Sequence, residues 1–148
     1  MRTLDSRADE AKNIDIYGHT APHMLRNFAL AFGTVFSLVG LLGFVQEFAG
    51  SGYLFGLFAV DPMVNIVHIL SGGFAFFAVL RGSRFVVMYF KAFGVVYTLL
   101  TIAGLIGGTH IFGLMATNVW DNALHLLIAV LALWAGFGSR EASLPYQR

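Results

Sequence analysis

The chain alternates between long apolar stretches and short polar segments. Four stretches, over residues 28–45, 62–80, 85–108 and 119–138, contain only two charged side chains, Lys91 and Asp121. Each is long enough, at about 1.5 Å per helical residue, to cross about 30 Å of hydrocarbon. None shows the polar face that a helix in a water-soluble bundle requires. The pattern therefore predicts an all-α integral membrane protein with four spanning helices.

The second half of the sequence repeats the first. Residues 31–38 match 92–99 at five of eight positions with an offset of 61, and 54–61 align with 111–118 at an offset of 57. A unit of two spans returns to the side it left, so both copies have the same orientation. We therefore expect a membrane four-helix bundle made of two parallel-repeat helical hairpins, related by a pseudo-two-fold axis along the membrane normal.

Local patterns predict how these helices start and pack. The first and third spans each carry small or hydroxyl-bearing residues on one face: Gly33, Ser37 and Gly40, then Gly94, Thr98 and Thr101. Small residues allow the close backbone approach on which helix packing in lipid depends, so these faces are predicted helix contacts. Asp61 followed by Pro62 predicts an N-cap and a first helical residue, and Asn118 holds the matching place before the fourth span.

Composition and charge set the class and the orientation. With 57% hydrophobic and 11% charged residues, the chain is not an ordinary soluble domain. Its nine Lys and Arg residues lie before the first span, around the second turn or after the fourth span, and the other two loops have none. By the positive-inside rule both termini are predicted to be cytoplasmic. The net charge of +1 is too small to indicate a nucleic acid partner.

These features divide the chain into three parts. Residues 1–24 are a polar cytoplasmic leader, residues 25–138 a domain of four transmembrane helices, and residues 139–148 a cytoplasmic tail. Within the domain, repeat one covers 25–81 and repeat two covers 85–138. The first span is too long, and the segment before it too polar, for a removable signal peptide.

A doubled motif gives the chain a family resemblance. The loop Leu54-Phe55-Gly56-Leu57-Phe58 is followed by Asn65-Ile66-Val67-His68, and the Asn-x-x-His pattern returns as Asn122-Ala123-Leu124-His125. In this context of loop and then helix, the motif resembles the prokaryotic four-span family named domain of unknown function 4383. The resemblance covers about Leu25 to Gly138. It implies the fold, the topology and a prokaryotic plasma membrane, and it implies no established activity.

The paired Asn and His residues are the candidate site. Residues three apart share one helix face, here one to two turns from the helix start. The loops 50–60 and 107–117 are apolar and rich in glycine, so their peptide groups at interface depth lack water. We expect Asn65, His68, Asn122 and His125 to form a structural polar clamp on these loops, because an unpaired buried polar group costs roughly 2–7 kcal/mol.

Two other interpretations use the same histidines. In the first, His68 and His125 are axial ligands on opposite sides of a haem or another tetrapyrrole. In the second, Glu47, His110 and Asp121 join them in a divalent-metal site on the outer face. None of these three has a counterpart of its type in the other repeat. The absence of cysteine excludes a thiolate metal site.

The sequence as a whole predicts a non-catalytic integral membrane protein. Its small size and lack of a recognisable catalytic arrangement favour an accessory or structural subunit of a larger membrane assembly. The predicted partners are the lipid bilayer and either other subunits or further copies of the chain. A haem-binding or other tetrapyrrole-binding protein is the first alternative, and an outer-face divalent-metal protein is the second.

Overall fold

The computed structural model of the chain describes residues 4–138, with side chains from His23 onward. Four long helices dominate the described part: α1 (Leu4–Leu42), α3 (Pro62–Arg81), α4 (Ser83–Gly107) and α5 (Val119–Gly138). All four are long and apolar enough to cross a membrane, α1 through its segment His23–Leu42. This confirms the prediction of an all-α bundle with four apolar helices. The predicted tail, 139–148, lies outside the described residues.

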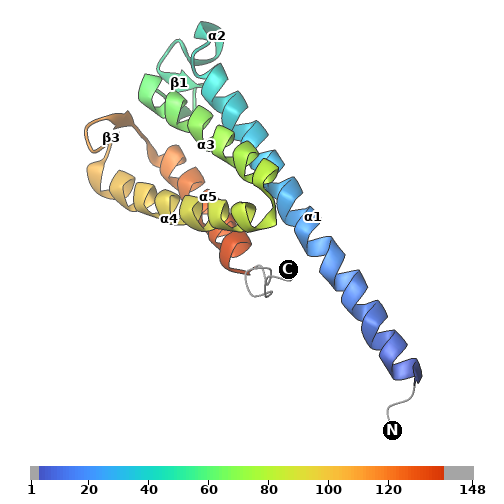
Figure 1. Cartoon of the computed structure of the whole chain (residues 1–148). Helices are drawn as coiled ribbons and strands as arrows, with labels where there is room; N and C mark the ends of the chain where they lie inside the picture. The colour runs from blue at the N-terminus through green and yellow to red at the C-terminus, as the bar shows by residue number, and fades with distance from the viewer. Residues whose placement is uncertain (1–3, 139–148) are drawn as a thin grey trace.

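The helices form two pairs that pack against each other (Figure 1). Helix α1 lies beside α3, and α4 lies beside α5. The N-terminal part of α1, which belongs to the predicted leader, continues as a helix beyond the bundle. The pairs meet mainly where α4 contacts α1 and α3. Since α1 and α5 have few direct contacts with each other, a groove separates them.

Glycines bring the helices of each pair close together. A Cβ atom on Gly72 of α3 would lie 2.7 Å from the Gly33 carbonyl oxygen of α1 and would strike Ser37 Oγ. One on Gly94 of α4 would lie 2.8 Å from Leu133 N of α5. Both distances are too short for any side chain, so these contacts require glycine. The predicted contact face of the first span is thus confirmed, and that of the third span is confirmed at Gly94.

The two threonines of the third-span face bond within their own helix. Thr98 Oγ1 donates to the Gly94 carbonyl oxygen and Thr101 Oγ1 to the Tyr97 carbonyl oxygen, both at 2.8 Å. Back-bonding of this kind satisfies a hydroxyl group in an apolar environment without a partner helix. The hydroxyl hydrogens of both threonines are therefore used within α4 and do not link it to α5.

Aromatic rings fill the space between α1 and α4. Phe32 of α1 meets Phe90 of α4 edge to face at 5.5 Å between ring centroids, and Phe36 meets Phe93 at 5.2 Å. Phe36 also meets Tyr97 edge to face at 5.6 Å. Such pairs contribute about 0.5–1.5 kcal/mol each beyond the area they bury. This aromatic core holds the two helix pairs together in the middle of the bundle.

Each loop between paired helices contains a small β-hairpin, which the sequence did not predict. After the short helix α2 (Gln46–Ala49), strands β1 (Tyr53–Leu54) and β2 (Phe58–Ala59) pair antiparallel. Strands β3 (His110–Ile111) and β4 (Met115–Ala116) do the same before α5. Pairing within each loop satisfies peptide groups that would otherwise lack water at the membrane interface.

The two hairpins turn in the same unusual way. Phe55 and Gly56 have φ angles of +53° and +72°, and Phe112 and Gly113 have +54° and +71°. Two consecutive positive φ angles define the tight turn whose twist matches that of the flanking strands. Positive φ is rare for a bulky residue such as Phe, so the same uncommon backbone conformation recurs at the same place in both hairpins.

Candidate functional site

The ends of α3 and α5 near the hairpins carry the main polar contacts of the bundle. Asp61 precedes α3, and its Oδ1 accepts a hydrogen bond from Val64 N at 2.8 Å, which confirms the predicted N-cap. Its second oxygen, Oδ2, accepts from Ala116 N in the other hairpin at 2.6 Å. A single carboxylate therefore starts one helix and holds a strand from the opposite half of the chain.

Asp121 makes the reciprocal contact. Its Oδ2 accepts hydrogen bonds from Asn118 N at 2.8 Å and from Ala59 N, in the first hairpin, at 3.1 Å. Its carboxylate is buried, with 8% of the residue exposed. Ala59 and Ala116 are the same distance from their hairpin turns, since each is the second residue of the second strand. Each half of the chain thus supplies a carboxylate to the matching strand of the other half.

Asn118 completes this set of contacts. Its Oδ1 accepts from Trp120 N at 2.8 Å and Asp121 N at 3.1 Å, so it caps α5 as predicted. Its Nδ2 donates to the Leu57 carbonyl oxygen in the first hairpin at 2.8 Å. We call Asp61, Asn118 and Asp121 the crossed clasp, because each caps or begins one helix and bonds the hairpin of the other half.

The two predicted asparagines lie deeper, against glycine. Asn65 and Asn122 are 2% and 8% exposed. Asn65 contacts Gly43 at the end of α1 so closely that a Cβ there would strike its amide, and Asn122 does the same with Gly104 of α4. Asn122 Oδ1 also accepts from Thr117 Oγ1 at 3.4 Å. Asn65 Oδ1 has no hydrogen-bond partner among the described residues.

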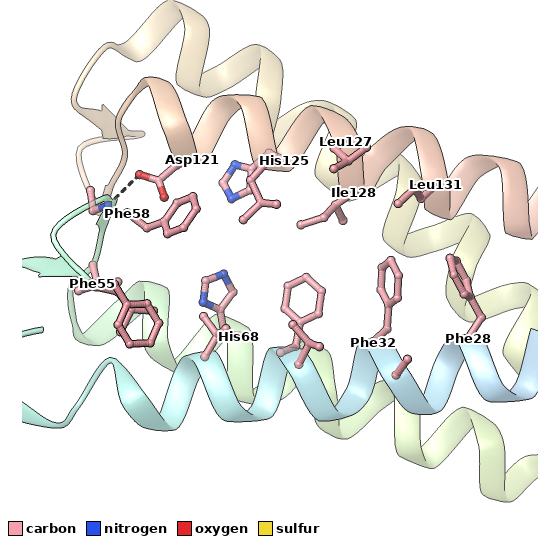
Figure 2. A pocket seen from close by; sticks show the side chains of 18 residues that line it. Phe28, Phe32, Phe55, Phe58, His68, Asp121, His125, Leu127, Ile128 and Leu131 are labelled. Atoms are coloured by element: carbon pink, nitrogen blue, oxygen red, sulfur yellow. Dashed lines mark hydrogen bonds between the residues drawn. The ribbon is translucent and has the colours of Figure 1, made fainter. Parts of the chain in front are cut away.

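The two histidines project into one cavity from opposite sides, as Figure 2 shows. The His68 ring lies edge-on to Phe36, with 5.5 Å between ring centroids, and His125 lies edge-on to Tyr97 at 5.3 Å. The Nδ1 atoms of both rings are buried without a hydrogen-bond partner among the described residues. The structure therefore brings the histidines together around a cavity. The hydrogen bonds that run from one half of the chain to the hairpin of the other half come from the crossed clasp.

Glu47, His110 and Asp121, which the second alternative adds to the histidines, do not form a cluster of metal ligands among the described residues. Glu47 and His110 are exposed, on α2 and on β3, and His110 Nδ1 lies 3.1 Å from Thr109 Oγ1. Asp121 is occupied by the clasp. Across residues 23–138, no group of three or more His, Asp or Glu side chains is placed to hold a metal ion. These positions therefore offer no cluster of ligands for a cation.

Sequence reasoning assigned the helix starts correctly but missed their second role. The sequence predicts Asp61 as a cap, Asn118 as its counterpart, and Asp121 as a residue of the alternative metal site. A carboxylate has four lone-pair positions, so a cap that uses one oxygen leaves the other free for a distant donor. The free second oxygen of a capping carboxylate therefore indicates that a further donor can bind it. Only the packing of the hairpins identifies that donor.

Comparison with known proteins gives a family and no activity. A family model described as Domain of unknown function (DUF4383) matches residues 26–138, which include the first apolar segment from residue 26 onward, the other three segments and both hairpins. No curated protein and no solved structure matches the chain.

Proposed function

The chain belongs to the family described as Domain of unknown function (DUF4383), and from that premise we propose that it is a non-catalytic module of a prokaryotic plasma membrane. In this proposal two equivalent hairpins form one rigid unit with both termini in the cytoplasm. The unit is an accessory or structural component of a larger membrane assembly. The crossed clasp is the observation that carries the proposal.

The clasp supports a mechanical role because it joins the halves reciprocally. Asp61 bonds the second hairpin and Asp121 bonds the first, in each case through a backbone N–H. Hydrogen bonds to ionised groups contribute about 1.5–3 kcal/mol each, roughly twice a neutral bond. Because both connections lie at the same end of the bundle, they hold the two hairpins as a pair. Such a unit keeps its outer surfaces in fixed positions for neighbouring membrane proteins.

The equivalence of the two halves is supported by matched geometry at fixed offsets. The turns at Phe55 and Phe112 have φ angles within a degree of each other. Val60 N donates to the Gly52 carbonyl oxygen at 3.0 Å, as Thr117 N does to the Thr109 carbonyl oxygen. Each of these residues in the second hairpin follows its counterpart in the first hairpin by 57 positions. A duplicated hairpin explains these coincidences, since independent loops have no reason to share them.

The outer surface of the helices leaves room for partners. Between 28% and 39% of the most apolar window of each span is buried inside the chain. Many of the remaining residues are large, apolar and exposed, and lipid or another membrane protein covers them. We propose that part of this surface contacts other subunits and that the rest contacts lipid.

Purification at native abundance tests the accessory role. A tagged chain expressed from its own locus, extracted in mild detergent, is expected to elute in a particle with at least one other membrane protein at fixed stoichiometry. Light scattering measures the mass of the particle and mass spectrometry identifies its subunits. A particle that contains only this chain contradicts the accessory role and indicates a free-standing protein or homo-oligomer.

Cysteine labelling tests the orientation. Since the chain contains no cysteine, Ser51→Cys, Thr109→Cys and Gly82→Cys each introduce a single reactive thiol. All three positions are exposed. A membrane-impermeant maleimide applied to intact cells is expected to label positions 51 and 109, and to label position 82 only after the membrane is opened. Labelling of position 82 in intact cells would reverse the proposed topology.

A tetrapyrrole bound by His68 and His125 is the alternative that one observation favours, because both rings line the same cavity. A histidine that ligates a metal usually donates its other ring N–H to a neighbouring acceptor, which fixes the ring. The Nδ1 atoms of both histidines have no such partner among the described residues. No described residue therefore fixes either ring through its Nδ1 atom. A visible absorption spectrum of the purified protein tests this alternative directly.

A further inference from the structure

The cavity between α1 and α5 has features of a binding site that the clasp does not explain. Its volume is about 390 Å³, within the range of roughly 300–1,000 Å³ typical of small-molecule sites. Phe28, Phe32 and Val35 of α1 form one wall, and Leu127, Ile128 and Leu131 of α5 form the other. The first hairpin closes one end of the cavity (Figure 2).

Polar groups are confined to the end beside the hairpin. His68, His125 and Asp121 line the cavity there, and the remaining lining is apolar. Both clasp bonds of Asp121 go to Oδ2, so Oδ1 accepts no hydrogen bond from the described residues. A neutral imidazole carries one donor and one acceptor, and a carboxylate only accepts. This end of the cavity can therefore both donate to and accept from a bound hydroxyl or carbonyl group.

The charges of the residues that line the cavity limit the kind of molecule that can bind there. None of the described residues that line the cavity is Lys or Arg, and Asp121 is its one acidic residue. A phosphate or carboxylate head would meet a carboxylate without a compensating cation, which is unfavourable in a low-dielectric site. A neutral head group that bears hydroxyl or carbonyl oxygens meets no such penalty.

The length and opening of the cavity indicate an apolar tail. Its α1 wall runs from Phe28 to Val39, which at 1.5 Å per residue is about 16 Å, or half of the hydrocarbon thickness. Val35 and Leu127 on the two walls are 57% and 54% exposed. The cavity is thus open between α1 and α5 along the surface that faces the bilayer. A lipid-soluble molecule can enter sideways without crossing water.

A second groove provides an internal comparison. It lies between α3 and α4, has a volume of about 460 Å³, and is lined by Phe93 and Val96, which align with Phe32 and Val35 at an offset of 61. Its lining includes no His, Asp or Glu. The two grooves therefore match in apolar wall and size, and differ in the polar end.

From these observations we infer that the α1–α5 cavity binds a neutral amphiphile. Its hydroxyl or carbonyl head lies at His68, His125 and Asp121, and its apolar tail lies along α1. This site goes beyond the accessory role and does not depend on it. Isoprenoid quinones and diacylglycerols share the required chemistry, so the experiment includes one probe of each kind.

Binding is measured with the full chain in nanodiscs of phosphatidylcholine. The probes are a diacylglycerol and an isoprenoid quinone, each carrying a photoreactive group in its tail. One of them is expected to label the chain saturably, with adducts in the segments 28–39 and 124–131. Phosphatidic acid with the same tails is expected to compete at least tenfold less well, because its head is anionic.

Matched substitutions separate this cavity from general lipid contact. Val35→Trp fills the α1–α5 cavity and is expected to lower labelling at least tenfold, whereas Val96→Trp in the other groove is expected to change it less than twofold. Leu127→Trp and Leu70→Trp form a second pair, with both wild-type residues 54% exposed. If Val35→Trp or Val96→Trp misfolds, the comparison of Leu127→Trp with Leu70→Trp tests whether labelling depends on the α1–α5 cavity.

The polar end is tested by replacing both imidazoles. The double variant His68→Phe with His125→Phe is expected to weaken binding by about tenfold or more, since it removes hydrogen bonds that contribute about 0.5–1.5 kcal/mol each. The proposal is wrong if neither probe saturates, or if the two Trp variants of a pair act alike. It is also wrong if purified protein shows a Soret band that the double variant lacks, because the histidines then ligate a tetrapyrrole.

Discussion

Removal of the Asp121 carboxylate is the most informative single perturbation of the clasp. Its Oδ2 is the acceptor for Ala59 N, which lies in the other hairpin, and for Asn118 N at the start of α5. Asp121→Ala leaves both N–H groups without their acceptor. Ala59 is 7% exposed, so water cannot readily replace the lost bond there.

The expected cost follows from those two bonds. At about 1.5–3 kcal/mol for a hydrogen bond to a charged group, two bonds give an upper range of roughly 3–6 kcal/mol. Burying a charged carboxylate costs free energy, and Asp121→Ala removes that cost. This offsets part of the loss from the two hydrogen bonds. We therefore expect Asp121→Ala to lower the free energy of unfolding by about 2–4 kcal/mol.

Glu47→Ala is the matched control. Glu47 is an exposed carboxylate near the same end of the bundle, on α2, and it makes none of the clasp's hydrogen bonds. Its removal is expected to change the free energy of unfolding by less than about 0.5 kcal/mol. Both variants are compared by reversible unfolding with sodium dodecyl sulfate in mixed micelles, followed by the loss of helical circular dichroism. An Asp121→Ala effect no larger than that of Glu47→Ala would refute the reasoning.

Two further predictions concern buried groups in the bundle. Because the Nδ1 atoms of His68 and His125 have no partner among the described residues, the double Phe variant is expected to unfold in detergent at the wild-type temperature or above. A fall of more than about 5 °C would contradict this. A Cβ on Gly104 strikes the Asn122 amide, whereas one on Gly73 meets nothing within 4 Å. Gly104→Ala is therefore expected to destabilise the protein by about 1–3 kcal/mol, and Gly73→Ala to be neutral or to stabilise it by up to about 1 kcal/mol; equal effects would exclude the close contact.

Much of the fold can be predicted from the sequence because it depends on local features of the chain. Uncharged stretches of membrane length predicted the four helices, and Gly33 and Gly94 predicted where they pack, since close approach in lipid depends on small residues. Asp61 and Pro62 predicted the start of α3 because capping is local. Each of these inferences requires only neighbours in sequence or a simple helical period.

The hairpins and the clasp were not accessible in the same way. Strands of two residues carry no alternation that a pattern can detect. The second bond of Asp61 goes to Ala116, 55 residues away, so it exists only once both hairpins are placed in space. The spacing predicts that each His shares a helix face with an Asn, but the lack of a partner for its Nδ1 atom among the described residues depends on how the hairpins fold.

The central claim is that the two hairpins hold each other at one end of the bundle, and a disulfide across the clasp tests it most directly. Leu57 and Val119 are partly or fully exposed and adjoin the bond from Asn118 Nδ2 to the Leu57 carbonyl oxygen. The variant Leu57→Cys with Val119→Cys, with a protease site at Gly82, is oxidised in native membranes and then cleaved. The account predicts that the two halves stay joined without reductant, whereas the control pair Leu57→Cys with Met88→Cys separates. Separation of the Leu57 and Val119 pair to the same extent as the control would contradict the claim.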